Sequence, residues 1–475
     1  MVLGSRWGIM RMAWQRSTCG FALCAGMLAC GDSTSGTGSG EQSMSSTLSP
    51  ETGNETTAGG ATESDAEVSS DAMTTSPTTM PPGTTTDEPA DSSLGPPVGF
   101  DVGSHPDAGI PDCAPGMGKG GGGSDPEFSY LWAANSAEGT ISKIDTETVL
   151  EIGRFATRPD ALGSPSRTSV SLSGNVAVAN RSGGITKIFA RESDCQESNG
   201  MGGLQTSNNA VALAWDVEEC RAWYLPFDYD SQRPVAWAPG EWNTASCSWH
   251  DERLWTAGRF GQQQTEVVLI DGDAGVVIDT VDIPGLKADQ FGLYGGAVDS
   301  EGNFWTTGWA DGNSLVRVDI DNMEATVFPG PSVVGVSHWY GMTVDVDGYV
   351  WNCASRAARF DPDTEDWTLS PELPWWNAGC MADAEPGGLL WMGSQGLLAI
   401  DRETFEVVHM WPTPSSYGVS IDFYGYVWAV SGNGAHRVDP DTGEVTSYNG
   451  LVGAYSYSDM TGYALNTVGG GTPSG

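Results

Sequence analysis

Basic residues are scarce in this sequence of 475 residues. It carries 21 Lys and Arg against 61 Asp and Glu, which gives a formal net charge of −40. Nucleic acids and anionic lipid surfaces are bound through clustered Lys and Arg, so we expect neither as a partner. The sequence also lacks any apolar run of roughly 18 residues, the length that predicts a transmembrane helix.

Several catalytic and metal-binding motifs are missing as well. No C-x-x-C spacing and no Cys/His cluster occurs, so no zinc site is predicted. There is no G-x-S-x-G nucleophile turn and no phosphate-binding P-loop. Charged residues make up only 17% of the chain, whereas 64 Gly and 19 Trp are present. This mixture favours turn-rich β-structure over long helices.

The N-terminal residues have the pattern of an export signal. Arg6, Arg11 and Arg16 precede a short apolar stretch over residues 19–29, too short to span a membrane. The following Met27-Leu28-Ala29-Cys30 resembles a bacterial lipobox, with Met in the place of the usual Leu. The resemblance implies a signal peptide over residues 1–29 and a lipid on Cys30. We therefore expect anchoring at the bacterial cell envelope, on the periplasmic or surface side of the outer membrane, with the lipid as the sole membrane contact. If the lipobox is not used, the protein is secreted.

Residues 30–124 are almost entirely Ser, Thr, Gly, Pro, Ala and acidic residues. Such a segment cannot bury enough apolar area to offset the entropy of ordering it. We expect a disordered linker here.

The cysteines indicate disulfides. Three of the nine belong to the signal peptide and the lipobox, which leaves an even number in an exported chain. We expect the pairs Cys195–Cys220 and Cys353–Cys380, although six cysteines allow fifteen connectivities. The six are Cys113, Cys195, Cys220, Cys247, Cys353 and Cys380.

From Phe128 onward the sequence repeats. The unit YGMTVDVDGYVWNCASRAARFDPDT (340–364) has close counterparts at 294–322 and 417–445 and a looser one at 379–407. Each predicts four short strands joined by Asp- and Gly-containing turns. A period of about 40–50 residues with four strands indicates an all-β fold, a β-propeller of four-stranded antiparallel blades.

Tryptophan marks the second strand of most units. Val178 takes this place in one unit, which makes eight second strands and predicts eight blades. Seven is the alternative, if the irregular region 191–243 is an insertion rather than a blade. The tryptophans are Trp132, Trp223, Trp255, Trp305, Trp351, Trp391 and Trp428.

The ends of the repeat region predict a closed ring. The first unit starts at its second strand, whereas the unclaimed segment 455–463 follows the last unit. We expect this segment to be the innermost strand of the first blade, which would remove the open sheet edges. The propeller then spans residues 125–466, and residues 467–475 form a flexible tail.

The pattern Tyr-Gly-x-x-x-Asp-x-x-Gly-x-x-Trp resembles NHL-type propellers, especially the streptogramin lyase (virginiamycin B lyase)-like group. That resemblance implies His and Glu around a magnesium ion. No His occupies the expected places before Gly295, Gly341 or Gly418, and His338 is the nearest catalytic candidate. We therefore do not carry the lyase activity over, and predict no metal ligands and no cofactor.

An enzymatic alternative stays open. It is a lyase or hydrolase that acts on a cyclic peptide or polysaccharide with Mg²⁺ or Ca²⁺. Asp-rich turns such as 345–348 superficially suggest calcium, but they lack the bidentate Glu of an EF-hand loop. Hairpin turns capped by Asp are the simpler interpretation.

Aromatic residues gather in the segments expected on one face of the propeller. Exposed aromatics among carboxylates suit a pocket for sugar rings or peptides. We expect a binding or scaffold module, monomeric, whose ligand is a glycan or an envelope protein. The alternative is that these side chains pack over the blade ends. The candidate ligand-binding residues are Trp309, His338, Trp339, Tyr340, Trp375, Trp376, Trp411 and Tyr417.

Overall fold

A computed structural model describes residues 128–469, apart from 262–263, 284–285, 287–290, 309–313, 332–337, 374–377 and 394. The predicted signal peptide, Cys30, Cys113 and the linker 30–124 lie outside these residues. Within them, no helix is both long and apolar enough to cross a membrane.

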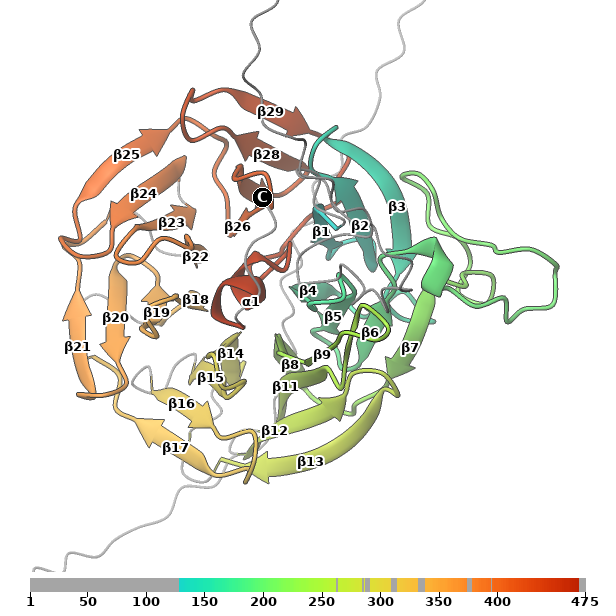
Figure 1. Ribbon diagram of the computed structural model, residues 1–475, viewed down its shortest axis with the longest axis horizontal. Coiled ribbons are helices and arrows are strands. Elements are labelled where there is room, and N and C mark those ends of the chain that lie inside the picture. The colour runs from blue at the N-terminus through green and yellow to red at the C-terminus, as the bar shows by residue number, and fades with distance from the viewer. Residues whose placement is uncertain are drawn as a thin grey trace, which may run out of the picture. The chain divides into compact units, whose positions relative to one another are not determined.

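The described residues form a β-propeller of seven antiparallel blades around a central channel (Figure 1). Blade 1 contains β1 (Tyr130–Asn135), β2 (Thr140–Asp145) and β3 (Leu150–Ala156). Blade 2 contains β4 (Pro165–Val170), β5 (Val176–Asn180), β6 (Ile185–Ile188) and β7 (Arg221–Leu225). Blade 3 contains β8 (Ser231–Ala238), β11 (Arg253–Phe260), β12 (Gln264–Asp271) and β13 (Val276–Asp282). Blade 4 contains β14 (Leu293–Val298), β15 (Phe304–Gly308), β16 (Leu315–Val318) and β17 (Ala325–Phe328).

The remaining blades repeat the same plan. Blade 5 contains β18 (Gly341–Val344), β19 (Val350–Cys353), β20 (Ala357–Asp361) and β21 (Asp366–Leu369). Blade 6 contains β22 (Cys380–Ala382), β23 (Leu389–Gly393), β24 (Leu397–Asp401) and β25 (Val407–Trp411). Blade 7 contains β26 (Gly418–Ile421), β27 (Val427–Ser431), β28 (Gly434–Val438) and β29 (Val445–Tyr448). In blades 2 to 7 the first-named strand lies next to the channel.

The predicted count of eight blades is wrong, and the alternative of seven is correct. Trp223 lies in β7, the outermost strand of blade 2, rather than in a second strand. Val178 of β5 already holds the second-strand place of that blade. The connection of β6 to β7, residues 189–220, is a long insertion. Because of this insertion, the separation of Trp223 from Val178 in the sequence is similar to the repeat period, so Trp223 was counted as the second strand of another unit.

The repeated Asp and Trp are hydrogen-bonded to each other. The indole Nε1 of Trp305, Trp351 and Trp428 donates to the carboxylate six residues earlier, over 2.8, 2.7 and 2.7 Å. The other oxygen of each carboxylate accepts backbone N–H groups of its own turn, as Asp345 does from Asp347 and Tyr349. One Asp therefore satisfies both the hairpin turn and the buried indole, which explains their fixed spacing.

The glycine of the Tyr-Gly pair allows neighbouring innermost strands to approach closely. A Cβ atom at Gly341 would lie 2.7 Å from the carbonyl oxygen of Ala378, and one at Gly418 would collide with that of Ser456. Gly341 N donates to Ala378 O over 3.1 Å, and Gly379 N to Tyr417 O over 2.8 Å. The channel is therefore narrow where the innermost strands begin.

The chain after β29 returns to blade 1. Tyr455 N donates to Ala134 O over 3.1 Å, and Trp132 N donates to Met460 O over 2.8 Å. Residues 455–460 thus run antiparallel to β1 on its channel side, although they form no regular strand. This segment occupies the fourth-strand place that blade 1 does not fill from its own repeat.

A short helix, α1 (Tyr463–Val468), lies within the ring (Figure 1). Asp459 accepts hydrogen bonds from Gly462 N over 2.9 Å and Leu465 N over 3.2 Å, which holds the first turn. Leu465 and Val468 are buried in the same cluster as apolar residues of β8, β14 and β18. A cavity of about 30 Å³ remains between them, room for about one water molecule. The helix therefore fills the channel at the level where the innermost strands end.

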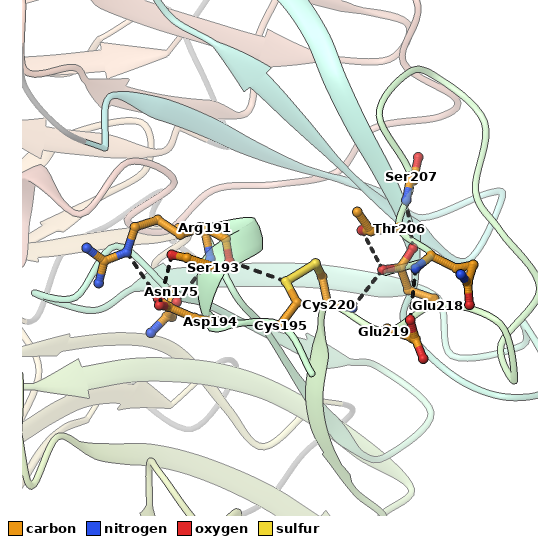
Figure 2. The surroundings of a disulfide bond; sticks show 12 residues. Asn175, Arg191, Ser193, Asp194, Cys195, Thr206, Ser207, Glu218, Glu219 and Cys220 are labelled. Atoms are coloured by element: carbon orange, nitrogen blue, oxygen red, sulfur yellow. Dashed lines mark hydrogen bonds and ion pairs between the residues drawn. A yellow bond between two sulfur atoms is a disulfide. The ribbon is translucent and has the colours of Figure 1, made fainter. Parts of the chain in front are cut away.

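The insertion between β6 and β7 is held by a disulfide and by two carboxylates (Figure 2). Cys195 and Cys220 are bonded, as predicted. Glu219 accepts backbone N–H groups of Ser198 and Gln205, over 2.6 and 2.8 Å. Glu218 accepts Ser207 N over 3.0 Å. A second excursion, the hairpin of β9 (Glu241–Asn243) and β10 (Ser248–His250), follows β8.

The second predicted disulfide is also confirmed. Cys353 at the end of β19 is bonded to Cys380 at the start of β22, across a sequence separation of 27 residues. It connects blades 5 and 6. On the opposite side of the same two blades, Arg402 lies 2.9 Å from Asp345 and 3.3 Å from Asp383.

Candidate binding site at the channel mouth

Aromatic and arginine side chains converge at the end of the channel where the innermost strands begin. Each comes from the first residues of such a strand, from the residues just before it, or from the closing segment 455–460. Because these strands run in the same direction around the axis, their first residues meet on one face. We call this set the mouth cluster: Arg167, Arg233, Phe291, Tyr294, Tyr340, Tyr417, Tyr455 and Tyr457.

Four tyrosine hydroxyl groups form one hydrogen-bonded network. Tyr457 donates to the hydroxyl of Tyr294 over 2.6 Å, and the hydroxyls of Tyr294 and Tyr455 are 2.9 Å apart. Tyr340 donates to Tyr455. The rings pack tightly as well, since the centroids of Tyr340 and Tyr457 are 4.5 Å apart. Tyr455 thus accepts from Tyr340 and is hydrogen-bonded to Tyr294, which in turn accepts from Tyr457.

The surroundings shift the phenol pKa values in opposite directions. Burial raises the pKa of Tyr457 to about 12, and it also raises the pKa values of Tyr294 and Tyr340. Burial alone would raise the pKa of Tyr455 too, but hydrogen bonds from Tyr294 and Tyr340 outweigh it and lower that pKa below the ordinary value. The network therefore favours one ionised phenol among neutral ones.

Two arginines lie close over these rings. The guanidinium carbon of Arg167 is 3.2 Å from the centroid of the Tyr457 ring, and that of Arg233 is 4.1 Å from the centroid of Phe291. Both also flank Tyr294, at 4.9 and 5.1 Å. Arg167 donates to the carbonyl oxygens of Tyr457 and Tyr340, over 2.7 and 3.2 Å. The site is therefore both aromatic and positively charged.

Part of the cluster reaches the surface. The Tyr417 side chain is 40% exposed, and Tyr455 and Phe291 are partly exposed. Arg181, from the turn after β5, adds a partly exposed guanidinium 5.1 Å from the Tyr455 ring. Arg167, Arg233 and Tyr294 lie buried beneath this rim.

The structure separates the predicted ligand-binding residues. Tyr340 and Tyr417 belong to the mouth cluster, and their ring centroids are 5.9 Å apart. Trp309, Trp375 and Trp376 lie outside the described residues. His338 is partly buried beside Trp339.

The expected exposure of Trp339 and Trp411 is wrong. Trp339 is 0% exposed and packs on Ala354 and Ala358, within blade 5. Trp411 is 6% exposed and stacks on Trp391 of blade 6, with ring centroids 5.1 Å apart. Both indoles fill space between strands, because so large an apolar side chain gains more from burial than from solvent contact.

Sequence reasoning missed the arginines and three of the four tyrosines in the hydrogen-bonded network. Tyr294 could have been found, since it stands before Gly295 as Tyr340 stands before Gly341. Tyr455 and Tyr457 lie in the predicted closing segment, but their side chains were given no role. Arg167 and Arg233 come from β4 and β8, which lack the Tyr-Gly pair, so no motif marked them.

Among the residues that the structure describes, no group of three or more His, Cys, Asp or Glu side chains is arranged to hold a metal ion. The Asp-rich turns are occupied by their own backbone. Asp361 accepts N–H groups of Asp363 and Thr364, over 2.9 and 3.3 Å.

Comparisons with known proteins assign no family to this chain. No family model and no curated protein matches the sequence. Among solved structures, the chain is similar to a protein of unknown function from Bacteroides caccae, with 10% identity, a TM-score of 0.39, and coverage of 59% of this chain and 93% of that one. It is also similar to apo AztD from Citrobacter koseri, with 12% identity, a TM-score of 0.40, and coverage of 69% and 95%. The β-propeller assignment therefore depends on the strand pairing of the chain itself.

Proposed function

We propose that this protein is a binding module of the bacterial envelope, in which a propeller held by a lipid on Cys30 captures a glycan or an envelope protein at the mouth cluster. The observation that carries the proposal is the convergence of aromatic rings and arginines at one end of the channel. One arginine, Arg167, also contacts the closing segment, since it donates to Tyr457 O over 2.7 Å. The backbone bonds of Tyr455 and Met460 to β1 do not involve side chains.

The two ends of the channel differ in a way that supports this choice. At the end where the innermost strands finish, Leu465 and Val468 of α1 fill the space with apolar contacts. At the mouth, tyrosine hydroxyl groups are hydrogen-bonded to one another, and Tyr417 is exposed. Binding sites combine apolar or aromatic walls with a few polar groups that fix orientation. Of the two channel ends, as far as the described residues show them, the mouth offers this combination.

A pull-down with a variant of the exposed rim tests the proposal. We expect Tyr417→Ala to reduce the capture of glycan or protein from an envelope extract at least about tenfold, since aromatic anchors carry much of the binding energy. Tyr426→Ala is the matched control, because Tyr426 belongs to the same blade but lies in the turn between β26 and β27, away from the mouth. Equal capture by wild type and Tyr417→Ala, with both folded, contradicts the proposal.

The anchor is tested separately. We expect radiolabelled palmitate fed to cells to be incorporated into the wild-type protein, and Cys30→Ser to abolish incorporation and release the protein from the membrane fraction. Cys113→Ser is the control for a second cysteine in the same N-terminal region. Labelling that persists in Cys30→Ser would remove the anchor from the proposal.

A further inference from the structure

Two of the buried arginines of this acidic protein have no acidic partner among the residues that the structure describes. Of the described residues, four arginines are less than 9% exposed: Arg154, Arg167, Arg233 and Arg402. Arg154 is paired with Glu151 at 2.8 Å, and Arg402 with Asp345 at 2.9 Å. Arg167 and Arg233 lie within 4 Å of no carboxylate in the described part of the chain, and both belong to the mouth cluster.

The lack of a carboxylate beside these two arginines is unusual on physical grounds. An arginine stays charged at every physiological pH, and a buried charge is costly unless it is paired. The chain offers 61 acidic residues against 21 basic ones, so carboxylates are not in short supply. The two unpaired guanidinium groups instead flank one ring, Tyr294, from 4.9 and 5.1 Å.

Both arginines keep hydrogen-bond donors for an additional acceptor. Arg167 uses its two terminal nitrogens on carbonyl oxygens, and its Nε has no partner. Arg233 makes a long Nε bond of 3.4 Å to Ser231, and its terminal nitrogens have no hydrogen-bond partner among the described residues. Its guanidinium carbon lies 4.1 Å from the centroid of the Phe291 ring, and a guanidinium fork can form two parallel bonds to a carboxylate.

The phenols cannot balance this charge. Even if Tyr455 is ionised, the mouth cluster with Arg181 carries three guanidinium groups against one phenolate, a surplus of two positive charges (3 − 1). A ligand with an anionic group would complete the pairing.

We propose that the mouth cluster binds the carboxylate of an acidic glycan, a uronic acid unit, through Arg233 and Arg167. The inference rests on the proposed function and names the ligand class of the same site. The exposed ring of Tyr417 and the partly exposed Tyr455 provide flat apolar faces for the sugar ring beside the charged groups. A peptide strand has no room between neighbouring innermost strands at the start of β18 and β22, because these approach closely enough for backbone bonds such as Gly341 N to Ala378 O over 3.1 Å.

Calorimetric titration of the purified full-length protein with defined oligomers tests the proposal. Tetragalacturonate is the ligand, maltotetraose is its neutral counterpart, and tetraglutamate is the acidic peptide. We expect tetragalacturonate alone to bind, with weaker affinity at 0.5 M than at 0.05 M NaCl, because salt screens the charge attraction.

Variants locate the binding. Arg233→Met keeps much of the packing and removes the charge, and we expect it to weaken tetragalacturonate binding about tenfold or more. Arg233→Lys retains the charge without the guanidinium fork. Its affinity for tetragalacturonate should lie between the affinities of Arg233→Met and wild type. Arg317→Met is the control, since Arg317 is paired with Asp299 and Asp319 in blade 4. Equal binding by Arg233→Lys and Arg233→Met, or an unchanged affinity in both, overturns the role of Arg233.

The comparison of the three oligomers decides which class of ligand the site binds. Binding of maltotetraose with equal affinity shows that charge is not recognised, and binding of tetraglutamate with equal affinity shows that the sugar is not. Either result overturns the proposal, as does the absence of binding by tetragalacturonate. The pull-down with Tyr417→Ala remains an independent test. If the pull-down captures a ligand through Tyr417 but tetragalacturonate does not bind, the proposed binding function is supported and the ligand is not a uronic acid.

Discussion

Four phenol groups of the mouth cluster differ in pKa although they share one hydrogen-bonded network. Tyr457 donates to Tyr294, and both Tyr340 and Tyr294 direct their hydroxyls at Tyr455. A donor stabilises an ionised acceptor, so Tyr455 becomes more acidic while its donors, buried and already hydrogen-bonded in their neutral form, become less acidic. At the scale of single residues, the site is therefore asymmetric.

We predict two phases when phenol ionisation is followed by absorbance at 295 nm. Tyr455 should ionise below the ordinary pKa of about 10, whereas Tyr457, whose pKa is about 12, should stay neutral until the protein unfolds. Tyr455→Phe should remove the early phase, and Tyr426→Phe should leave it unchanged. An early phase that survives Tyr455→Phe contradicts this assignment.

The same shifts set the sign of the alkaline stability profile. Tyr294, Tyr340 and Tyr457 have raised pKa values in the folded state, so the unfolded chain loses their protons first as the pH rises. Their contribution to stability is complete below pH about 10 and is lost above it. We expect Tyr457→Phe to flatten the fall in melting temperature between pH about 10 and 12.

At the scale of strands and blades, the sequence was most informative where one residue serves two structural needs. The carboxylate of Asp345 holds both its turn and the indole of Trp351, so the spacing of the pair is fixed and visible in the sequence. The glycine of the Tyr-Gly pair is fixed by the neighbouring backbone in the same way. These local constraints predicted the blades from blade 4 onward.

The sequence was less informative where the interacting residues are far apart in the chain. Trp223 has the residue type of a second strand but follows an insertion whose length no local pattern reveals, and this raised the blade count from seven to eight. Arg167 meets Tyr457 only because the chain closes 290 residues later. Contacts of that kind arise from ring closure, so a search for local motifs could not find them.

The disulfide between blades offers a test at the same scale. Cys353 and Cys380 close a loop with a sequence separation of 27 residues, for which the chain-entropy relation gives about 3–4 kcal/mol of stability. We expect the double variant Cys353→Ser/Cys380→Ser to lower the free energy of unfolding by about this amount in denaturant titrations. The pair Cys195→Ser/Cys220→Ser is the comparison. It closes a surface insertion and should disturb that loop more than the ring. An unchanged unfolding midpoint for the inter-blade variant would contradict the role given to this bond.

For the whole propeller, the segment after β29 decides whether the ring is closed. Ala454 bridges Asn135 of β1 and Gly432 after β27, and Met460 accepts Trp132 N over 2.8 Å. Thr461 donates to Ile421 O and lies 2.9 Å from Ser420 of β26. The segment thus joins the first and last blades before α1 enters the apolar core of blades 3 to 5.

Removal of residues 455–475 should therefore open the ring rather than trim an end. It exposes the channel side of β1 and the apolar surface beneath Leu465, and both unpaired sheet edges and solvent-exposed apolar surface are costly. We expect the truncated protein to lose a single cooperative unfolding transition, or to melt more than about 10 °C lower, in a calorimetric scan. Removal of residues 470–475 alone is the control and should leave the melting temperature unchanged. If the two truncated proteins melt alike, the first and last blades are held together by their own contacts, and the C-terminal segment serves the mouth cluster without closing the ring.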